Sequence, residues 1–205
     1  MVKELFVNEE YNQLFVKKEE LSLNSVKQYK VSVPDELSKI MVIKDKILDL
    51  GQKIGQTIIF VPTKISAGML HDALVNYGYP VTTIHGAMSQ EDRDKIVKEF
   101  KDGLTHVLIS TDVIARGFDQ SQVNLVVNYD LPVVYNNPTQ PDTEVYLHRI
   151  GRAGRFGRKE MLFTFSFSSW AQLAFNIIKM GYVGLPVCDV KLTQSMWQRI
   201  GHQRP

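Results

Sequence analysis

The feature that most constrains the fold is a series of short, apolar, β-branched runs separated by amphipathic stretches. The runs stand at 57–61, 81–85, 106–110 and 124–128. Helical patterns follow the first two runs at 66–77 and 90–101, and a short turn or helix is expected from Asp112 after the third. Apolar strands that alternate with helices are typical of a parallel sheet covered on both faces. The sequence therefore predicts an α/β fold, with ligands gathered beyond the carboxyl ends of the strands.

The flanking sequence suggests three parts. A half-buried strand is expected at 27–33, ended by Pro34, and Asp35 can cap the next helix. Residues 1–26 are rich in Lys, Glu and Asn, whereas only six of the last 46 residues, from Glu160 on, are charged. We expect a lead-in at 1–26, one domain at 27–168 that includes a last strand at 161–167, and an atypical tail at 169–205.

Composition excludes several classes of protein. The chain of 205 residues is 44% hydrophobic, enough for a substantial core, and its one cysteine cannot form an internal disulfide. No apolar run reaches the roughly 18 residues of a membrane helix. The acidic start is unlike a secretory signal, so neither membrane insertion nor export is expected. The net charge of +2 neither demands nor excludes nucleic acid as a partner.

The strongest motif is HRIGRAGRFGR at 148–158. It places arginines three apart, at 149, 152, 155 and 158, with glycines between them. Arginine offers a permanently charged fork of donors that grips phosphate, and glycine permits close backbone approach. The alternative interpretation is a solvated basic turn.

The segment STDVIARGFD at 110–119 directly follows an apolar run. Thr111 and Asp112 stand where a strand meets a helix start, a place suited to phosphate. Asp119, held close by Gly117, could accept hydrogen bonds from ribose hydroxyls. The alternative is an ordinary cap and turn.

The segment HGAMSQEDRD at 85–94 also follows a strand pattern. Gly86 frees the backbone, and Ser89 can cap the next helix. Gln90 and Arg93 share one helix face and could contact backbone phosphates. A capped helix with a surface arginine is an equal alternative.

Some chemistry has no counterpart in the sequence. It contains no Gly-Lys dipeptide, and therefore no phosphate loop, and no Asp-Glu-x-Asp run. Neither metal-ligand spacing of Cys and His nor paired catalytic carboxylates occur, so no metal site is expected. The arginines would thus form half of a nucleotide site.

These motifs resemble, in order, those of the second RecA-like domain of DEAD-box RNA helicases, over residues 22–159. TIIFVPT is similar to motif IV, HGAMSQEDRD to the segment after it, STDVIARGFD to motif V and HRIGRAGR to motif VI. The segments LSLNSVKQYKV and FDQSQVNLVVNYDLP, with an insertion at 135–143, are most similar to the nuclear-pore mRNA-export helicases, especially plant members. The resemblance implies a RecA-like parallel sheet of the P-loop NTPase-like superfamily.

The resemblance also implies roles for individual residues. Arg152 and Arg155 match the arginine fingers that reach the γ-phosphate of ATP, and His148 matches a histidine that couples the two domains. Gly117 and Asp119 match positions beside the ATP ribose. The positions that touch the RNA sugar-phosphate backbone correspond to Gly86, Gln90, Arg93 and Thr111.

The implied cofactor is ATP with Mg²⁺, bound mainly by a first RecA-like domain whose phosphate loop and DEAD box this sequence does not contain. The implied partners are that domain, single-stranded RNA or mRNA, a nucleoporin and an activator dependent on inositol hexakisphosphate. The expected location is the cytoplasm and the nucleus, including the nuclear envelope.

The chain alone is expected not to unwind RNA or hydrolyse ATP. Two alternatives stay open. One is a non-catalytic module that binds RNA or protein partners, and the other is a domain for an unrelated phosphorylated metabolite.

Overall fold

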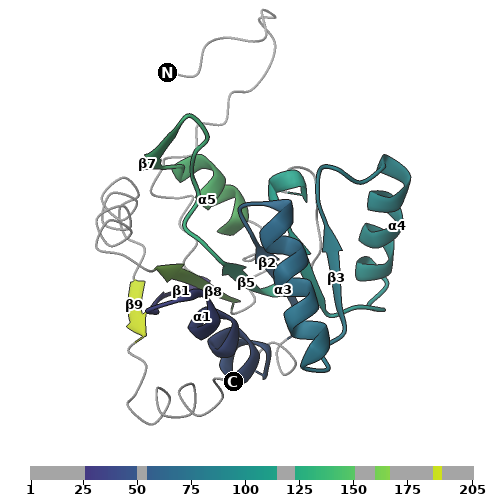
Figure 1. Ribbon diagram of the computed structural model, residues 1–205, viewed down its shortest axis with the longest axis horizontal. Helices are drawn as coiled ribbons and strands as arrows, with labels where there is room; N and C mark the ends of the chain where they lie inside the picture. Colours follow the sequence, from purple (N-terminus) through teal and green to yellow (C-terminus); the bar gives the residue numbers. More distant parts are fainter. Residues whose placement is uncertain (1–25, 50–54, 115–122, 151–159, 167–186, 191–205) are drawn as a thin grey trace, which may run out of the picture.

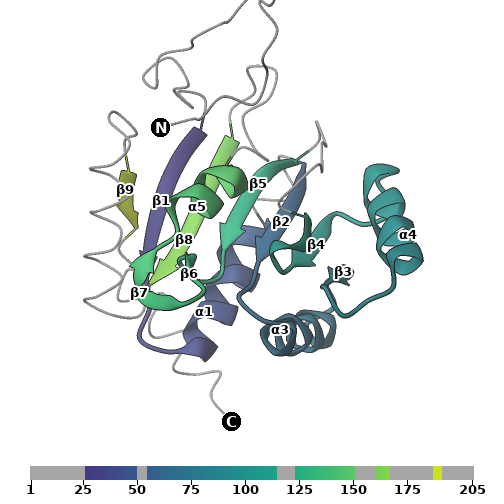
Figure 2. The same ribbon diagram turned by 90° about the horizontal axis from the view of Figure 1, so that it is seen from above.

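The computed structural model describes residues 26–49, 55–114, 123–150, 160–166 and 187–190. Within them seven strands form one sheet in the order β3-β4-β2-β5-β8-β1-β9 (Figures 1 and 2). Every neighbouring pair is parallel. The strands are β1 (Val26–Ser32), β2 (Gln56–Phe60), β3 (Val81–Ile84), β4 (Val107–Ser110), β5 (Val123–Asn128), β8 (Glu160–Ser166) and β9 (Val187–Val190).

Helices cover both faces of this sheet, as the sequence predicts. They are α1 (Glu36–Val42), which continues into a π-helical turn η1 (Ile43–Leu48), α3 (Lys64–Asn76), α4 (Gln90–Lys101) and α5 (Thr143–Ile150). A 3₁₀ turn η2 (Asp112–Ile114) follows β4. Side-chain oxygens of Asp35, Thr63 and Ser89 accept hydrogen bonds from backbone amides and begin α1, α3 and α4.

Two hydrophobic cores, one on each face, explain why the strands are apolar throughout. Ile59 and Val61 point into the core beneath α1 and α3. Ile58 and Phe60 point into the opposite core, which Phe100 of α4 and Ile150 of α5 close. Because both faces are covered, all residues of β2 are buried. The prediction of a doubly covered parallel sheet is confirmed.

The segment predicted as an atypical tail contributes one strand. Strand β9 pairs in parallel with β1, with Gln28 opposite Val187, and forms the last strand of the sheet. The rest of residues 169–205 and the lead-in at 1–25 lie outside the described residues. The three-part division therefore stays a prediction.

The insertion at 135–143 forms, with the two residues before it, a β-hairpin that the sequence did not predict. Strands β6 (Val133–Val134) and β7 (Asn137–Pro141) form an antiparallel hairpin immediately before α5. The side chain of Asn137 accepts hydrogen bonds from the amide and the hydroxyl of Thr139. Tyr135 at the turn is 97% exposed.

Candidate functional site

The predicted site residues that the structure describes lie at the carboxyl edge of the sheet. Gly86 lies two residues after β3, Thr111 directly follows β4, and Gln90 and Arg93 lie in the first turn of α4. His148 is in the last turn of α5, next to Arg149, which bonds Asp112 beyond the end of β4. The remaining predicted residues, Gly117, Asp119, Arg152 and Arg155, lie outside the described residues. The fold brings motifs from three places in the chain to one edge.

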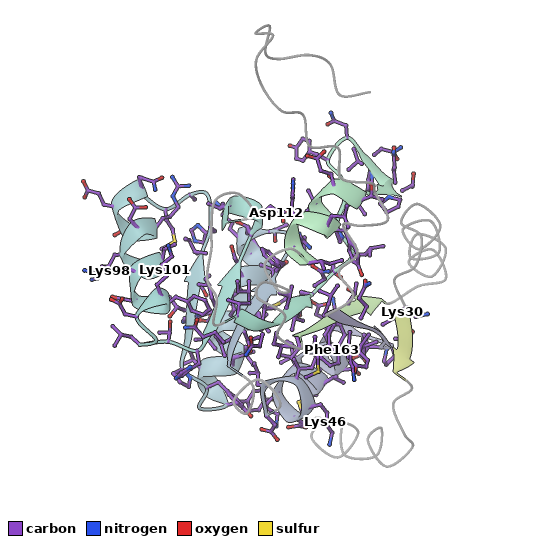
Figure 3. All side chains as sticks on the ribbon, turned by 180° about the vertical axis from the view of Figure 1, so that it is seen from behind. Lys30, Lys46, Lys98, Lys101, Asp112 and Phe163 are labelled. Atoms are coloured by element: carbon purple, nitrogen blue, oxygen red, sulfur yellow. The ribbon has the colours of Figure 1, made fainter. Side chains whose placement is uncertain are left out.

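The most constrained part of this edge is the guanidinium of Arg149. Its Nε and Nη2 donate to Oδ1 of Asp112 at 2.8 and 2.7 Å, and its Nη1 donates to Oδ1 of Asn128 at 3.0 Å. The guanidinium carbon lies 5.0 Å from the centre of the Phe60 ring. The arginine side chain is 3% exposed, whereas that of Asp112 is 49% exposed. Asp112 lies beside α5 at the rim of the molecule (Figure 3).

Further buried polar groups continue from this pair beneath α5. Nδ2 of Asn128 donates to the hydroxyl of Thr164 at 3.2 Å. The hydroxyl of Tyr146 donates to Oε1 of Gln28 at 2.8 Å. Burial raises the pKa of Tyr146, and a hydrogen bond with Thr164 opposes this rise. Buried polar side chains from β5, β8, α5 and β1 thus lie under one helix, and the exposed Asp112 of η2 binds the arginine among them.

The Arg149 pair corrects one expectation from the motif. The motif was interpreted as a group of arginines that grip phosphate, with Arg152 and Arg155 at the γ-phosphate, but Arg149 of the same motif is buried and hydrogen-bonded within the fold. Burial lowers the pKa of its guanidinium, and the carboxylate of Asp112 opposes that effect. The spacing of apolar residues in the helix could have revealed that Arg149 is buried. One face of α5 carries Tyr146, Arg149 and Ile150, and all three are buried.

The region around α4 differs in character. Nε2 of Gln90 donates to Oδ1 of Asp94 at 2.7 Å, and both side chains are exposed. Nε of Arg93 has no hydrogen-bond partner among the described residues. The amide of Thr111 donates to the carbonyl of Ile84 at 3.3 Å and ties the ends of β4 and β3 together. The side chain of Gln90 is exposed at this edge, whereas Nε of Arg93 is buried.

Gly86 stands at the centre of this region. A Cβ placed there would meet only Cγ2 of Val113, at 3.5 Å, an ordinary contact. The fold itself therefore does not require glycine at this position. A close approach by a ligand backbone would give a reason for it.

A second buried charge, which sequence reasoning missed, lies at the end of β5. Lys39 of α1 is fully buried, and its Nζ lies 2.8 Å from Oδ1 of Asp130 and 3.3 Å from Oε2 of Glu36. The ammonium is also 4.0 Å from the centre of the Tyr129 ring. Burial raises the pKa of the Asp130 carboxyl, and Lys39 opposes this rise.

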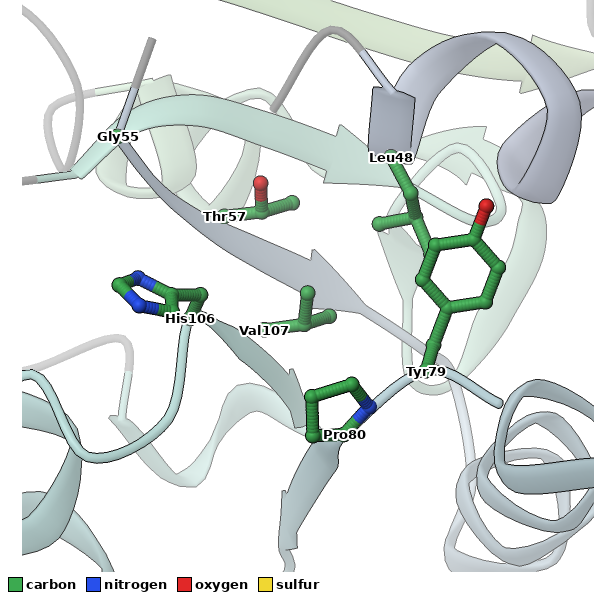
Figure 4. Close-up of a pocket in the computed structure, with 7 residues that line it drawn as sticks. All are labelled: Leu48, Gly55, Thr57, Tyr79, Pro80, His106 and Val107. Atoms are coloured by element: carbon green, nitrogen blue, oxygen red, sulfur yellow. The ribbon is translucent and has the colours of Figure 1, made fainter. Parts of the chain in front are cut away.

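A cavity of about 330 Å³ opens at the other edge of the sheet, near the amino ends of β2 and β4 (Figure 4). Its lining is mostly apolar and includes none of the predicted site residues. The lining residues are Leu48, Gly55, Thr57, Tyr79, Pro80, His106 and Val107. The cavity therefore belongs to a different edge from the candidate site.

Two further classes of feature are missing from the described part of the chain. In these residues no three or more His, Cys, Asp and Glu side chains are grouped so that they could hold a metal ion. No helix in the same ranges combines the length and the apolar character that a membrane span requires.

The protein family and the curated proteins to which this chain is similar are helicases. Residues 38–157 match the family model described as "Helicase conserved C-terminal domain". "DEAD-box ATP-dependent RNA helicase 38" of Arabidopsis thaliana is 66% identical over 152 residues, and the protein of the same name from Oryza sativa subsp. japonica is 63% identical over 152. Each alignment covers 74% of this chain but 30% of the relative, so the chain spans about a third of these proteins.

Solved structures show the same fold. The structure of S. cerevisiae Dbp5 bound to RNA and ADP BeF3 has a TM-score of 0.81 and 34% identity, covering 93% of this chain and 48% of that one. A Dbp5 variant bound to nup159, a gle1 variant, ip6 and adp has a TM-score of 0.72 and 29% identity, covering 88% and 45%.

Proposed function

This chain belongs to the DEAD-box RNA helicases, whose conserved C-terminal domain it carries, and we propose that it acts as the second RecA-like half of an ATP-dependent RNA helicase. In this role it completes an ATP site and an RNA site that it shares with a first RecA-like domain. The observation that carries the proposal is the ion pair between buried Arg149 and half-exposed Asp112, which holds α5 at the carboxyl edge three residues before Arg152.

The proposed ATP site uses residues next to this pair in the sequence. Arg152 and Arg155 reach the γ-phosphate and stabilise the charge of the transition state, while Gly117 and Asp119 lie beside the ribose. His148 couples the two domains. ATP and its Mg²⁺ are held mainly by the first domain, because the sequence contains no phosphate loop and its described residues offer no metal cluster. The ion supplies charge neutralisation to the phosphates when bound.

The proposed RNA site is the exposed region around the start of α4. Gly86, Gln90, Arg93 and Thr111 contact the sugar-phosphate backbone of a single strand. The exposed side chain of Gln90, the unpartnered Nε of Arg93 and the room for a Cβ at Gly86 support this assignment. Contacts to backbone and 2′-hydroxyl carry little sequence specificity. Closing the two domains on ATP and RNA would bend the strand and open a short duplex, and hydrolysis would reopen the domains.

The partners and location are proposed from similarity. The Dbp5 chains that this fold matches were solved with RNA, and with nup159, gle1 and ip6. We place the parent helicase in mRNA export, in the nucleus, at the nuclear envelope and in the cytoplasm, with a nucleoporin and an inositol hexakisphosphate-dependent activator as partners.

The decisive experiment is ATPase turnover in a chimera that joins this chain to the first RecA-like domain of the Arabidopsis relative. We expect RNA-stimulated ATPase, and we expect Arg155→Ala to reduce it by about 10³-fold or more, the effect of an arginine finger. Lys98→Ala, a lysine on the outer side of α4 (Figure 3), is the matched control and should keep turnover. Full turnover by the Arg155→Ala chimera would refute the proposed role.

A second candidate, favoured by the lack of a phosphate loop in the sequence, is a non-catalytic module that binds RNA or protein partners. The chain without a first domain, mixed with saturating single-stranded RNA, should not hydrolyse ATP. It should bind RNA weakly, with an affinity that falls steeply as salt rises, because phosphate contacts dominate. Turnover by the isolated chain would exclude the module.

A further inference from the structure

We propose that Ser89, at the start of α4, is a phosphorylation site through which a serine kinase weakens RNA binding. The phosphate on Ser89 pairs with Arg93, one turn further along the helix, and withdraws that guanidinium from the RNA backbone. This inference rests on the proposed function, because it assumes that RNA is held at the start of α4. It adds a means of regulating that site.

The Ser89 hydroxyl is accessible to an enzyme. Ser89 is exposed, and so are Gly86 and Ala87 in the turn before it. The backbone of Ser89 is extended, with φ −61° and ψ 158°, and residues 85–89 lie between the end of β3 and the start of α4. A serine on an exposed turn can enter the cleft of a kinase more readily than a serine inside a helix or a strand.

The capping of α4 does not by itself require a serine. The Ser89 hydroxyl accepts a hydrogen bond from the amide of Asp92 at 3.1 Å and donates one to Oδ2 of the same residue at 2.7 Å. Asparagine and aspartate cap helices about as well as serine does. Of these three residue types only serine can accept a phosphoryl group, so a kinase would give a reason for the serine that the cap does not.

The residues after Ser89 indicate the class of kinase. Glu91, Asp92 and Asp94 follow within five positions, and all three are exposed. A kinase with a basic substrate groove can recognise such a sequence by its charge. The segment 85–94 already sets these three carboxylates against the single positive charge of Arg93. Further negative charge there should therefore weaken the binding of an RNA backbone strongly.

Arg93 is the group that the phosphate captures. Ser89 and Arg93 are four positions apart, a spacing that makes side chains neighbours on the surface of a helix. Nε of Arg93 is buried and has no hydrogen-bond partner among the described residues. A phosphoserine carries about −1.5 to −2 charges at pH 7 and three acceptor oxygens, which suit a guanidinium. The same arginine cannot serve both this phosphate and the RNA backbone.

The modification is a phosphoryl transfer from ATP held by the kinase. Oγ of Ser89 attacks the γ-phosphorus, an O–P bond forms, and the bond from that phosphorus to its bridging oxygen breaks to release ADP. The hydroxyl proton passes to a carboxylate of the kinase. Oγ then has no proton to donate to Asp92, and the like charges of the phosphate and the Asp92 carboxylate repel each other.

A matched pair of variants separates charge from folding. Ser89→Asn keeps a helix cap without charge, whereas Ser89→Asp keeps a cap and adds one negative charge. Both chains should keep a thermal midpoint within about 2 °C of the wild type. In fluorescence anisotropy with labelled single-stranded RNA, Ser89→Asn should bind within about twofold of the wild type, and Ser89→Asp about threefold more weakly or worse.

The phosphorylated chain provides the full test. Casein kinase 2, which prefers serines followed by acidic residues, should place a phosphate on Ser89 in the presence of ATP, as mass spectrometry can locate. RNA affinity should then fall by about tenfold or more. Because one contact to an RNA phosphate is lost, the slope of log affinity against log salt should become shallower by roughly 0.7. In an Arg93→Gln chain, phosphorylation should weaken RNA binding by less than about threefold.

Each outcome decides between the two roles of Ser89. The inference would be overturned if the kinase leaves Ser89 unmodified, if the phosphorylated chain keeps its RNA affinity, or if Ser89→Asn and Ser89→Asp lose affinity equally. An equal effect of phosphorylation with and without Arg93 would also overturn it. An unmodified chain that does not bind RNA at low salt would instead refute the proposed RNA site, and this inference with it.

Discussion

Two regions of one sheet edge, the α5 side and the α4 side, hold their polar residues in opposite ways. Beneath α5, Arg149, Asn128 and Thr164 are buried and hydrogen-bonded across several elements. At α4, the bonds that the structure gives Ser89 and Gln90 reach three or four residues along the same helix, and both side chains are exposed. This difference matches the functions proposed for the two regions. The ATP site next to α5 needs hydrogen-bond donors held in fixed positions for the transition state, and the RNA site at α4 needs donors that the RNA backbone can reach.

The comparison makes a general point about where mutations act. A change on the α5 side should unfold or misalign the domain, because it leaves buried polar atoms without partners. A change on the α4 side should leave the fold nearly intact and reduce RNA affinity alone. Four variants, ordered from the largest expected effect on stability to the smallest, test this contrast.

Lys39→Met should cause the largest loss of stability, about 3 kcal/mol near pH 7, because it leaves Asp130 partly buried without its cation. Burial raises the pKa of Asp130 in the fold. A carboxyl with a raised folded pKa contributes stability below its unfolded pKa and loses it as pH rises through the folded pKa. The deficit should therefore shrink as pH falls towards about 4. Urea unfolding at several pH values measures it, and a deficit that does not depend on pH would contradict the assignment.

Arg149→Met should cost about 2 kcal/mol, because the buried Oδ1 of Asn128 loses its donor while half-exposed Asp112 can regain water. For a chain of this length the thermal midpoint should fall by roughly 4–8 °C. Calorimetry of the chain measures this shift. An unchanged midpoint would mean that the contacts of Arg149 do not hold α5.

Ser89→Ala should cost about 1 kcal/mol, the usual value for a lost helix cap. The loss should fall on α4, so hydrogen exchange should speed up in the first turn of this helix and stay unchanged in α5. Exchange that rises equally in both helices would remove the contrast between the two regions.

Gly86→Ala should change stability by less than about 0.5 kcal/mol, because the added methyl group meets only Val113 at ordinary contact distance. RNA affinity of the chain should nevertheless fall, since the methyl group occupies the surface proposed for the RNA backbone. Fluorescence anisotropy with labelled single-stranded RNA measures it. Unchanged affinity would remove Gly86 from the proposed RNA site.

Much of this edge could be predicted from the sequence. The predicted strands at 57–61, 81–85, 106–110 and 124–128 agree with β2, β3, β4 and β5 within one residue at each end, and α4 has the predicted bounds. Apolar runs and capping residues are local signals in the sequence, and such signals predict the bounds of strands and helices well.

Other features depend on contacts between distant residues and had no local signal. The motif predicted arginines that grip phosphate and gave no separate role to Arg149, whose partners lie 21 and 37 positions away. Lys39 reaches Asp130 across 91 positions, which no helical period reveals. The order of strands in the sheet is likewise a property of the tertiary structure.

That order has a consequence for how the chain is made. Strand β1 is the first described strand to leave the ribosome, but it pairs only with β8 and β9, the last two. Val26 meets Glu160, so at roughly 5–20 residues per second β1 waits on the order of ten seconds for its first neighbour. During synthesis both edges of this strand are open, and chaperones have their longest access to the segment that finally lies inside the sheet.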